Sequence, residues 1–315
     1  MSSPPIAFIF PGQGSQEVGM GRAWAEAHPA ARAVFDQADE VLGFALSRLC
    51  WEGPEEELVL TANTQPALLA TSVAIAQVLA GAGLAPAAVA GHSLGEYSAL
   101  VATGALTFAD ALRLVRRRGE LMQQAVPVGV GAMAAIMGID GDAVTAVAAE
   151  ISRQRRGEVC AVANLNGPLQ TVIAGHRAAV EAAIELARSR GAKIAKLLPV
   201  SAPFHSPLMR PAREGLEPLL RATSFDDPSA PVVTNADARP ATTGEEARDA
   251  LIRQIDGPVR WYESMRYLRQ QAGIGRFVEV GPKNVLCGLG RRIDRDASWH
   301  HLPGPEAIDK LLQER

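Results

Sequence analysis

The chain has 315 residues, of which 48% are hydrophobic and 21% charged, so it can bury a large core and is not intrinsically disordered. Its 31 Lys and Arg against 34 Asp and Glu give a net charge of −3, which argues against a protein that coats nucleic acid. Cys50, Cys160 and Cys287 are far apart and form no CxxC pair, which excludes a disulfide scaffold and a cysteine zinc site.

Targeting signals are not evident in the sequence. The N-terminus lacks the basic region of a signal peptide, and the apolar run 6–10 is too short for one. The stretch 66–91 comes closest to a membrane span, but Gly81, Gly83 and Pro86 interrupt it, whereas a spanning helix needs about 20 unbroken apolar residues. We therefore expect a buried helix, a turn and a buried strand there, in a soluble cytoplasmic protein with no membrane contact.

The first part of the chain alternates short buried strands with helices. Strands separated by helical patterns indicate an α/β fold with a parallel sheet. In chain order we expect a strand at 6–10, a mostly helical region over 23–83 with turns near Gly43 and Gly53, a strand at 87–90, helices at 97–104 and 108–124, and, after an insertion, strands at 232–234 and 276–280.

The pattern changes after Pro127, where strands and helices follow in the order βαββαβ. We expect strands at 131–139, 159–163, 171–174 and 194–200, with helices at 142–153 and 178–190. This order is that of the ferredoxin-like or split βαβ arrangement. We therefore predict a small lobe of residues 128–200 inserted into a large lobe that comprises 1–127 and 201–315.

The segment Gly91-His92-Ser93-Leu94-Gly95 gives the sharpest chemical signal. A G-x-S-x-G sequence between a strand and a helix places the serine on a tight turn, where the glycines let neighbouring backbone approach without a Cβ clash. The hydroxyl then lies at a helix N-terminus, whose amide donors face a developing oxyanion. Only three positions are fixed, so a chance match is the alternative, but the flanking strand and helix favour Ser93 as a nucleophile.

A serine nucleophile needs a base, and the chain has six histidines. His92 adjoins the serine, but neighbours in a tight turn diverge, so we expect it to support the site. His205 lies in a loop stiffened by two prolines, where the small lobe rejoins the large one. A structural loop histidine is the alternative, but the need for a base favours His205. The other four are expected at capping or surface positions: His28, His176, His300 and His301.

Helical geometry singles out one arginine. At about 100° per residue, Arg118 falls within the apolar arc of the helix 108–124, between Val115 and Met122. A buried guanidinium requires an anion, and its planar fork suits a carboxylate held by two parallel hydrogen bonds. Two interpretations stay open: Arg118 binds the carboxylate of a substrate, or it forms an internal salt bridge with one of the protein's own acids.

The glycine-rich segment 11–16, Pro-Gly-Gln-Gly-Ser-Gln, follows the first strand. It is no dinucleotide-binding loop, because Glu17 stands where the third glycine is needed, and no Gly-Lys-Ser/Thr sequence suggests a phosphate loop. Such a turn can instead supply a backbone N–H to an oxyanion hole. No HExxH sequence, histidine pair or acidic cluster suggests a metal, so we expect no metal and no bound cofactor.

Five dispersed motifs, in order along residues 6 to 295, together resemble the malonyl-CoA:acyl carrier protein transacylases. They are Phe10-Pro11-Gly12-Gln13-Gly14-Ser15-Gln16, Gly91-His92-Ser93-Leu94-Gly95-Glu96, the helix that carries Arg118, Phe204-His205-Ser206 and Val280-Gly281-Pro282. The resemblance implies an α/β-hydrolase-like lobe with an inserted ferredoxin-like lobe. It also implies a cytoplasmic enzyme that takes malonyl-CoA and an acyl carrier protein as its partners.

By position, the resemblance implies that Ser93 is the acylated nucleophile and that His205 is its general base and acid. The histidine would be oriented by a backbone carbonyl of Gln254 instead of an aspartate. Ser93 would attack the malonyl thioester and expel coenzyme A, and the phosphopantetheine thiol of the carrier protein would then attack the malonyl-serine ester.

The resemblance also implies that Arg118 binds the malonyl carboxylate and that the backbone N–H groups of Gln13 and Leu94 form the oxyanion hole. Related domains that load methylmalonyl units carry a polar residue at the position of Leu94 and a small one at that of Phe204. A bulky Phe204 would crowd an α-methyl group, which favours malonyl by about 1–3 kcal/mol.

Several alternatives remain at this point. A serine esterase or thioesterase could use the same turn, and it would need an acidic partner for the histidine and no buried arginine. A non-catalytic scaffold is disfavoured because nucleophile, base and anion-binding residue are all present. The sequence does not separate fatty-acid from polyketide biosynthesis, and nothing in it demands more than a monomer. One cluster of basic residues could meet an acidic carrier protein or be solvated helix ends: Arg153, Arg155, Arg156, Arg188 and Arg190.

Overall fold

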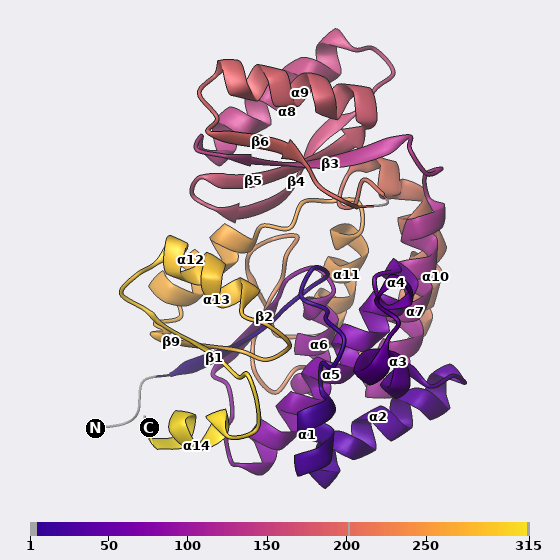
Figure 1. Ribbon diagram of the computed structural model, residues 1–315. Helices are drawn as coiled ribbons and strands as arrows, with labels where there is room; N and C mark the ends of the chain where they lie inside the picture. The colour runs from indigo at the N-terminus through magenta and orange to yellow at the C-terminus, as the bar shows by residue number, and fades with distance from the viewer. Residues whose placement is uncertain (1–4, 201, 314–315) are drawn as a thin grey trace.

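The structure is a computed structural model that describes residues 5–200 and 202–313. It has a larger α/β unit with a smaller sheet above it, and the small sheet carries its own helices on its outer face (Figure 1). The large sheet contains six strands in the order β10-β9-β1-β2-β7-β8. Their bounds are β1 Ile6–Phe10, β2 Ala88–Gly91, β7 Val232–Val233, β8 Pro240–Ala241, β9 Arg276–Glu279 and β10 Ser298–His301.

All pairings in the large sheet are parallel except that of β7 with β8. Strand β1 is buried along its whole length because helices cover both faces of the sheet, which explains why it is a continuous apolar run. Phe8 and Phe10 pack on one side with α5, whereas Ala7 and Ile9 pack on the other with α12 and α13. The helices of this unit are α1 Arg22–Ala27, α2 Pro29–Leu42, α3 Leu46–Glu52, α4 Glu55–Leu58, α5 Thr61–Gly81, α6 Gly95–Ala102, α7 Phe108–Gln124, α10 Arg210–Ala222, α11 Gly244–Gln254, α12 Trp261–Gln270, α13 Val285–Ile293 and α14 Ala307–Gln313.

Helix α5 is long and apolar enough to cross a membrane by length and composition alone. Within the protein, however, 83% of its most apolar window is buried against other elements. It is followed by a turn and by the buried strand β2, as the sequence predicted. The apolar stretch is therefore a core element of the α/β unit.

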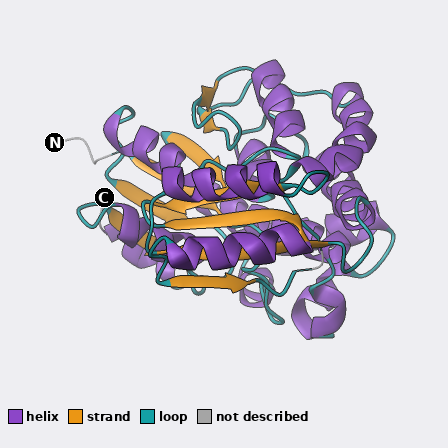
Figure 2. Cartoon of the chain, turned by 90° about the horizontal axis from the view of Figure 1, so that it is seen from above, coloured by secondary structure: helices purple, strands orange, loops and turns teal. Residues whose placement is uncertain are grey.

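The small sheet has four antiparallel strands in the order β4-β5-β3-β6. Helices α8 and α9 cover one of its faces, as the view from above makes plain (Figure 2), and their apolar sides form a separate core with the sheet. The chain order βαββαβ confirms the predicted ferredoxin-like arrangement. The bounds are β3 Gly131–Met137, α8 Gly141–Gln154, β4 Cys160–Gly167, β5 Gln170–His176, α9 Arg177–Ser189 and β6 Ile194–Leu197.

The two largest differences from the predicted strand ends are both in the small sheet. Strand β4 extends to Gly167 instead of residue 163, because register shifts against β5 and a bridge from Asn164 to Val259 of the large unit keep its polar end paired. Strand β6 ends at Leu197 instead of residue 200, just before Pro199. The lobe boundaries at 127/128 and 200/201 stay a prediction, and residue 201 lies outside the described residues.

Candidate active site

The predicted serine lies on a sharp turn between β2 and α6. Its backbone has a φ of 53°, in the left-handed region that is unfavourable for a residue with a Cβ atom. A Cβ atom on Gly91 would lie 1.9 Å from the carbonyl carbon of Gly95, and one on Gly95 would lie 2.0 Å from the carbonyl oxygen of Phe10. The two glycines of the G-x-S-x-G sequence are thus required by backbone contacts on either side of Ser93.

The hydroxyl of Ser93 meets a histidine from a distant loop. Ser93 Oγ lies 2.7 Å from His205 Nε2, and His205 Nδ1 lies 2.9 Å from the backbone carbonyl oxygen of Gln254. Burial, together with the positive charge of nearby Arg118, lowers the pKa of His205 from 6.5 to about 3. The imidazole is therefore neutral at pH 7, with Nδ1 donating to the carbonyl and Nε2 free to accept the proton of the serine.

Arg118 lies on α7, 2% exposed, with its guanidinium at the same site. Nη1 donates to Gln65 Oε1 at 2.8 Å, and Nη2 donates to Ser93 Oγ and to Gln254 Oε1, both at 3.0 Å. None of the ion pairs among the described residues includes Arg118, so the internal salt bridge that the sequence left open is not formed there. A buried cation with no direct ion pair to a described residue therefore lies beside the nucleophile.

The site opens into a cavity of about 480 Å³ between the large sheet and the small one. Six of the predicted site residues line this cavity: Gln13, Ser93, Leu94, Arg118, Phe204 and His205. The seventh, Gln254, contacts the far nitrogen of the histidine ring through its backbone carbonyl. The backbone N–H groups of Gln13 and Leu94 donate to no acceptor among residues 5–200 and 202–313. Two free donors at a helix N-terminus and a neighbouring turn suit an oxyanion.

Comparison with known proteins assigns the chain to a family. The family model described as acyl transferase domain matches residues 7–297. The chain is 48% identical to the malonyl CoA-acyl carrier protein transacylase of Bacillus subtilis strain 168, over 98% of this chain and 96% of that protein. The Escherichia coli K12 protein of the same name is also 48% identical, over 98% and 99%. The chain belongs to the malonyl-CoA:acyl carrier protein transacylase family.

Solved structures agree with this assignment. The transacylase of that name from Coxiella burnetii matches with a TM-score of 0.95 and 43% identity, covering 99% of this chain and 98% of the other. A malonyl transacylase in complex with the acyl carrier protein of a type II polyketide synthase matches with a TM-score of 0.94 and 44% identity, covering 99% and 100%. The α/β fold with a parallel-rich sheet and a separate antiparallel sheet is thus the fold of this transacylase family.

Sequence reasoning missed a residue that supports the nucleophile. The side chain of Asn235 accepts from Ser93 N at 2.7 Å and donates to the carbonyl oxygen of Gly91 at 2.6 Å. It therefore fixes the backbone that enters the turn, at Gly91 and at Ser93 itself. Asn235 lies two residues beyond the end of β7 and directly after the strand predicted at 232–234. The carboxyl ends of neighbouring parallel strands meet at one edge of a sheet, so this position could have signalled it.

Three further side chains that the sequence did not suggest complete the site: Gln65, Glu96 and Asn166. Gln65 on α5 accepts from the guanidinium of Arg118, and Glu96 on α6 accepts from the side chain of Gln254. Asn166 Oδ1 lies 2.8 Å from His92 Nε2, whose ring packs against Trp261. This contact joins the small sheet to the catalytic turn, and the supporting role of His92 stays a prediction.

The remaining histidines are remote from the nucleophile. His28 and His176 precede α2 and α9, as expected. His300 and His301, expected at the surface, are half-buried because they form part of the edge strand β10. No group of three or more His, Cys, Asp or Glu side chains among the described residues could hold a metal ion.

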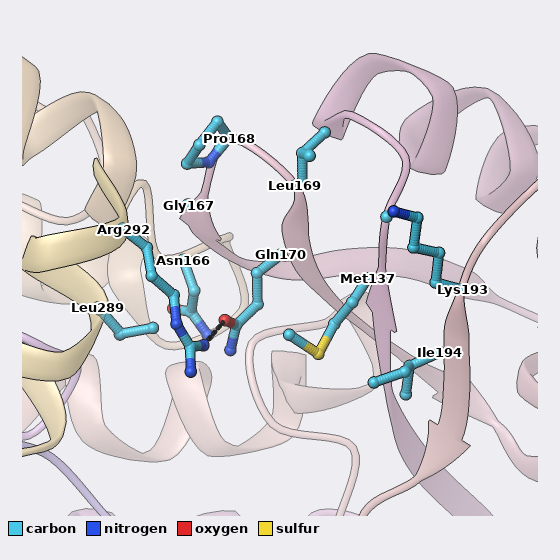
Figure 3. A pocket seen from close by; sticks show the side chains of 11 residues that line it. Met137, Asn166, Gly167, Pro168, Leu169, Gln170, Lys193, Ile194, Leu289 and Arg292 are labelled. Atoms are coloured by element: carbon cyan, nitrogen blue, oxygen red, sulfur yellow. Dashed lines mark hydrogen bonds between the residues drawn. The ribbon is translucent and has the colours of Figure 1, made fainter. Parts of the chain in front are cut away.

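A second cavity of about 340 Å³ adjoins the first at the end of the small sheet (Figure 3). The two share Asn166, Gln170 and Leu289 in their walls. Arg292 on α13 donates to Gln170 Oε1 at 3.0 Å across this boundary. A recess lined by residues of β3, β6 and α13 therefore adjoins the active-site cavity of this transacylase.

Proposed function

We propose that this chain transfers a malonyl group from malonyl-CoA to the phosphopantetheine thiol of an acyl carrier protein through an ester on Ser93. The observation that carries the proposal is the buried guanidinium of Arg118, which lies 3.0 Å from Ser93 Oγ and forms no ion pair with a described residue. A desolvated cation at this place favours an acyl group that ends in a carboxylate. The family's curated members carry the corresponding name.

The first half-reaction acylates the serine. His205 Nε2 takes the hydroxyl proton while Ser93 Oγ attacks the thioester carbonyl, and the N–H groups of Gln13 and Leu94 hold the resulting oxyanion. The intermediate collapses, the carbon–sulfur bond breaks, and the imidazolium returns its proton to the coenzyme A thiolate. The second half-reaction repeats these steps in reverse with the carrier protein's thiol as the nucleophile.

The polar contact of Gln254 takes the place of a catalytic aspartate in this scheme. Its carbonyl oxygen accepts from His205 Nδ1 at 2.9 Å, which fixes the tautomer and the ring orientation. A serine esterase built on the same turn would need an acidic partner for the histidine. The backbone partner and the buried arginine both favour acyl transfer over that alternative.

Selection among acyl groups would rest on two residues. Acetyl-CoA has no carboxylate and would leave Arg118 without its anion, whereas malonyl-CoA would supply one. Phe204, 8% exposed in the cavity wall, would crowd an α-methyl group and disfavour methylmalonyl-CoA. The chain would need no cofactor of its own, because coenzyme A arrives as part of the substrate.

The basic cluster on α8 and α9 gains little support as a docking surface for the carrier protein. Arg155, Arg188 and Arg190 are each paired with a nearby carboxylate, and such pairs reduce the net charge that they offer. We propose a cytoplasmic monomer that could serve fatty-acid or polyketide biosynthesis, with the pathway set by the carrier protein that is present.

Mass spectrometry of the intact protein after exposure to malonyl-CoA tests this function. We expect a malonyl adduct on Ser93 that is lost when a phosphopantetheinylated carrier protein is added. Ser93→Ala should not be labelled. The matched control is Ser98→Ala on α6, which removes a buried hydroxyl that has no hydrogen-bond partner among the described residues and should leave labelling intact. Labelling of Ser93→Ala, or loss of the adduct to water alone, would contradict the proposal.

A further inference from the structure

The side-chain amide of Gln254 lies between two opposite charges. Its oxygen accepts from Arg118 Nη2 at 3.0 Å, and its nitrogen donates to Glu96 Oε2 at 3.0 Å and to the backbone carbonyl of Ser93 at 3.0 Å. The side chains of Gln254, Arg118 and Glu96 are almost completely buried. The guanidinium and the carboxylate are thus connected through one amide and form no direct ion pair.

This arrangement permits one orientation of the amide. A guanidinium can only donate, and an ionised carboxylate can only accept, so a flipped amide would turn its N–H groups toward Arg118 and its oxygen toward Glu96. Because water is excluded at this depth, either mismatch would leave buried groups unpaired. The acceptor at Glu96, together with the backbone carbonyl of Ser93, therefore determines which atom of Gln254 faces the guanidinium.

The acceptor on Glu96 is itself held in place. Glu96 Oε2 also accepts from the backbone N–H of Asn235 at 2.8 Å, and the side chain of Asn235 fixes the turn that carries Ser93. A backbone N–H cannot be flipped or rotated away, so it keeps an oxygen at this point. The same oxygen thereby serves the nucleophile through Asn235 and the guanidinium through Gln254.

We propose that Glu96 is a positioning residue for acyl-group selection: through its hydrogen bond to Gln254 it holds the guanidinium of Arg118 in place to receive the substrate's carboxylate. The inference rests on the proposed role of Arg118 in binding malonyl. An acetyl group makes no contact that needs a fixed guanidinium. Loss of the Glu96 acceptor should therefore impair malonyl loading more than acetyl loading.

The test measures single-turnover acylation of Ser93 by malonyl-CoA and by acetyl-CoA and takes the ratio of the two rates. This ratio does not depend on the fraction of folded protein, so partial loss of a destabilised variant does not obscure it. Assays at a pH of about 8 keep the carboxyl ionised, since burial raises the pKa of Glu96 to about 7 against the opposing hydrogen bonds from Asn235 and Gln254.

Glu96→Leu removes the acceptor and should lower the malonyl-to-acetyl ratio by about tenfold or more, because the guanidinium loses its fixed partner. Glu96→Gln is the rescue variant: its amide oxygen would be pinned by Asn235 N and could still accept from Gln254, so most of the ratio should return. The matched control is Glu120→Gln on α7, which removes a partly exposed carboxylate paired with Arg116 and should leave the ratio unchanged.

A double-mutant cycle identifies the route. In a Gln254→Leu background the connecting amide is missing while the backbone carbonyl that orients His205 remains, so Glu96→Leu should cause no further fall in the ratio. An unchanged ratio in Glu96→Leu, a fall of equal size in both backgrounds, or a Gln variant as poor as the Leu variant would each overturn the proposal. If Arg118→Ala also left the malonyl-to-acetyl ratio unchanged, the proposed role of Arg118 in binding malonyl would itself be wrong. If Arg118→Ala lowered the ratio and the Glu96 variants left it unchanged, the role of Arg118 would stand and only the role of Glu96 would be wrong.

Discussion

Ser93 and His205 share an unfavourable backbone conformation, with φ values of 53° and 57°, and their side chains meet at 2.7 Å. Residues with a Cβ atom pay of order 1–3 kcal/mol for such angles, so the surrounding structure must hold both in place. Asn235 forms hydrogen bonds with the amide of Ser93 and the carbonyl of Gly91, and the loop of His205 is tightened by a hydrogen bond from Ser206 Oγ to the carbonyl of Pro203. The two reacting groups are therefore pre-positioned before a substrate binds.

Asn235→Ala should slow acylation of Ser93 strongly. The change removes both hydrogen bonds that hold the turn and leaves the N–H of Ser93 and the carbonyl of Gly91 unpaired, which costs about 1–3 kcal/mol for each buried group. The rate of malonyl-serine formation and the free energy of unfolding in urea are the measurements. Asn284→Ala is the control, since that side chain is exposed and makes no capping hydrogen bond. A normal rate of acylation in Asn235→Ala would show that the turn keeps its conformation without these two hydrogen bonds.

Gly95→Ala should destabilise the fold, because its methyl group would lie 2.0 Å from the carbonyl oxygen of Phe10 in the neighbouring strand. The nearest atoms are all backbone atoms of Phe10 and Pro11, which cannot rotate aside as a side-chain end could. We therefore expect a loss of about 3 kcal/mol or more in the free energy of unfolding. Gly288→Ala, in the interior of α13 with open space around it, should instead stabilise by about 0.5–1 kcal/mol. Equal melting temperatures for the two variants would contradict this account.

Local patterns in the sequence predict the parts of this site that local geometry determines. The strand–turn–helix around Ser93 and the inward face of α7 that carries Arg118 follow from residue spacing alone. The partners of these groups come from chain segments far away, and their meeting depends on how the strands of the sheet are ordered. Spacing therefore gave no signal for Glu96 as an acceptor, and only the family resemblance pointed to the carbonyl of Gln254.

Arg118→Ala should reduce malonyl loading far more than acetyl loading. The variant loses the cation that would pair with the malonyl carboxylate, whereas acetyl makes no such contact, and a lost charged hydrogen bond corresponds to about a tenfold to hundredfold fall in rate. Arg118→Lys should restore only part of the loss, because an ammonium cannot reproduce the planar fork that contacts Gln65 and Gln254. The relative rates with the two thioesters are the measurement, and a fall of the same size for both would count against the assignment.

Phe204→Ala should relax selection against branched acyl groups. The ring lines the active-site cavity, and its removal makes room for an α-methyl group that is worth about 1–3 kcal/mol of discrimination. In competition between malonyl-CoA and methylmalonyl-CoA, the ratio of methylmalonyl-enzyme to malonyl-enzyme should rise about tenfold. Leu289→Ala, also in the cavity wall, is the control for a general loss of packing. An equal rise in both variants would mean that cavity size alone matters, not the position of Phe204.

The buried imidazole of His205 should make the protein less stable as the pH falls. Burial lowers its pKa from 6.5 to about 3, so between these values the unfolded chain binds a proton that the folded protein does not. The free energy of unfolding should thus decrease through this window by up to about 1.4 kcal/mol per pH unit from this group, and be insensitive to it above pH 6.5. Because other groups titrate there too, the informative quantity is the difference between wild type and His205→Asn, whose neutral side chain has no such proton. In urea unfolding, the wild type should lose more free energy of unfolding than His205→Asn as the pH drops from 6.5 to 4. Ser93→Ala, which retains the histidine, should follow the wild type. Parallel curves for wild type and His205→Asn would show that the imidazole takes up its proton equally in both states.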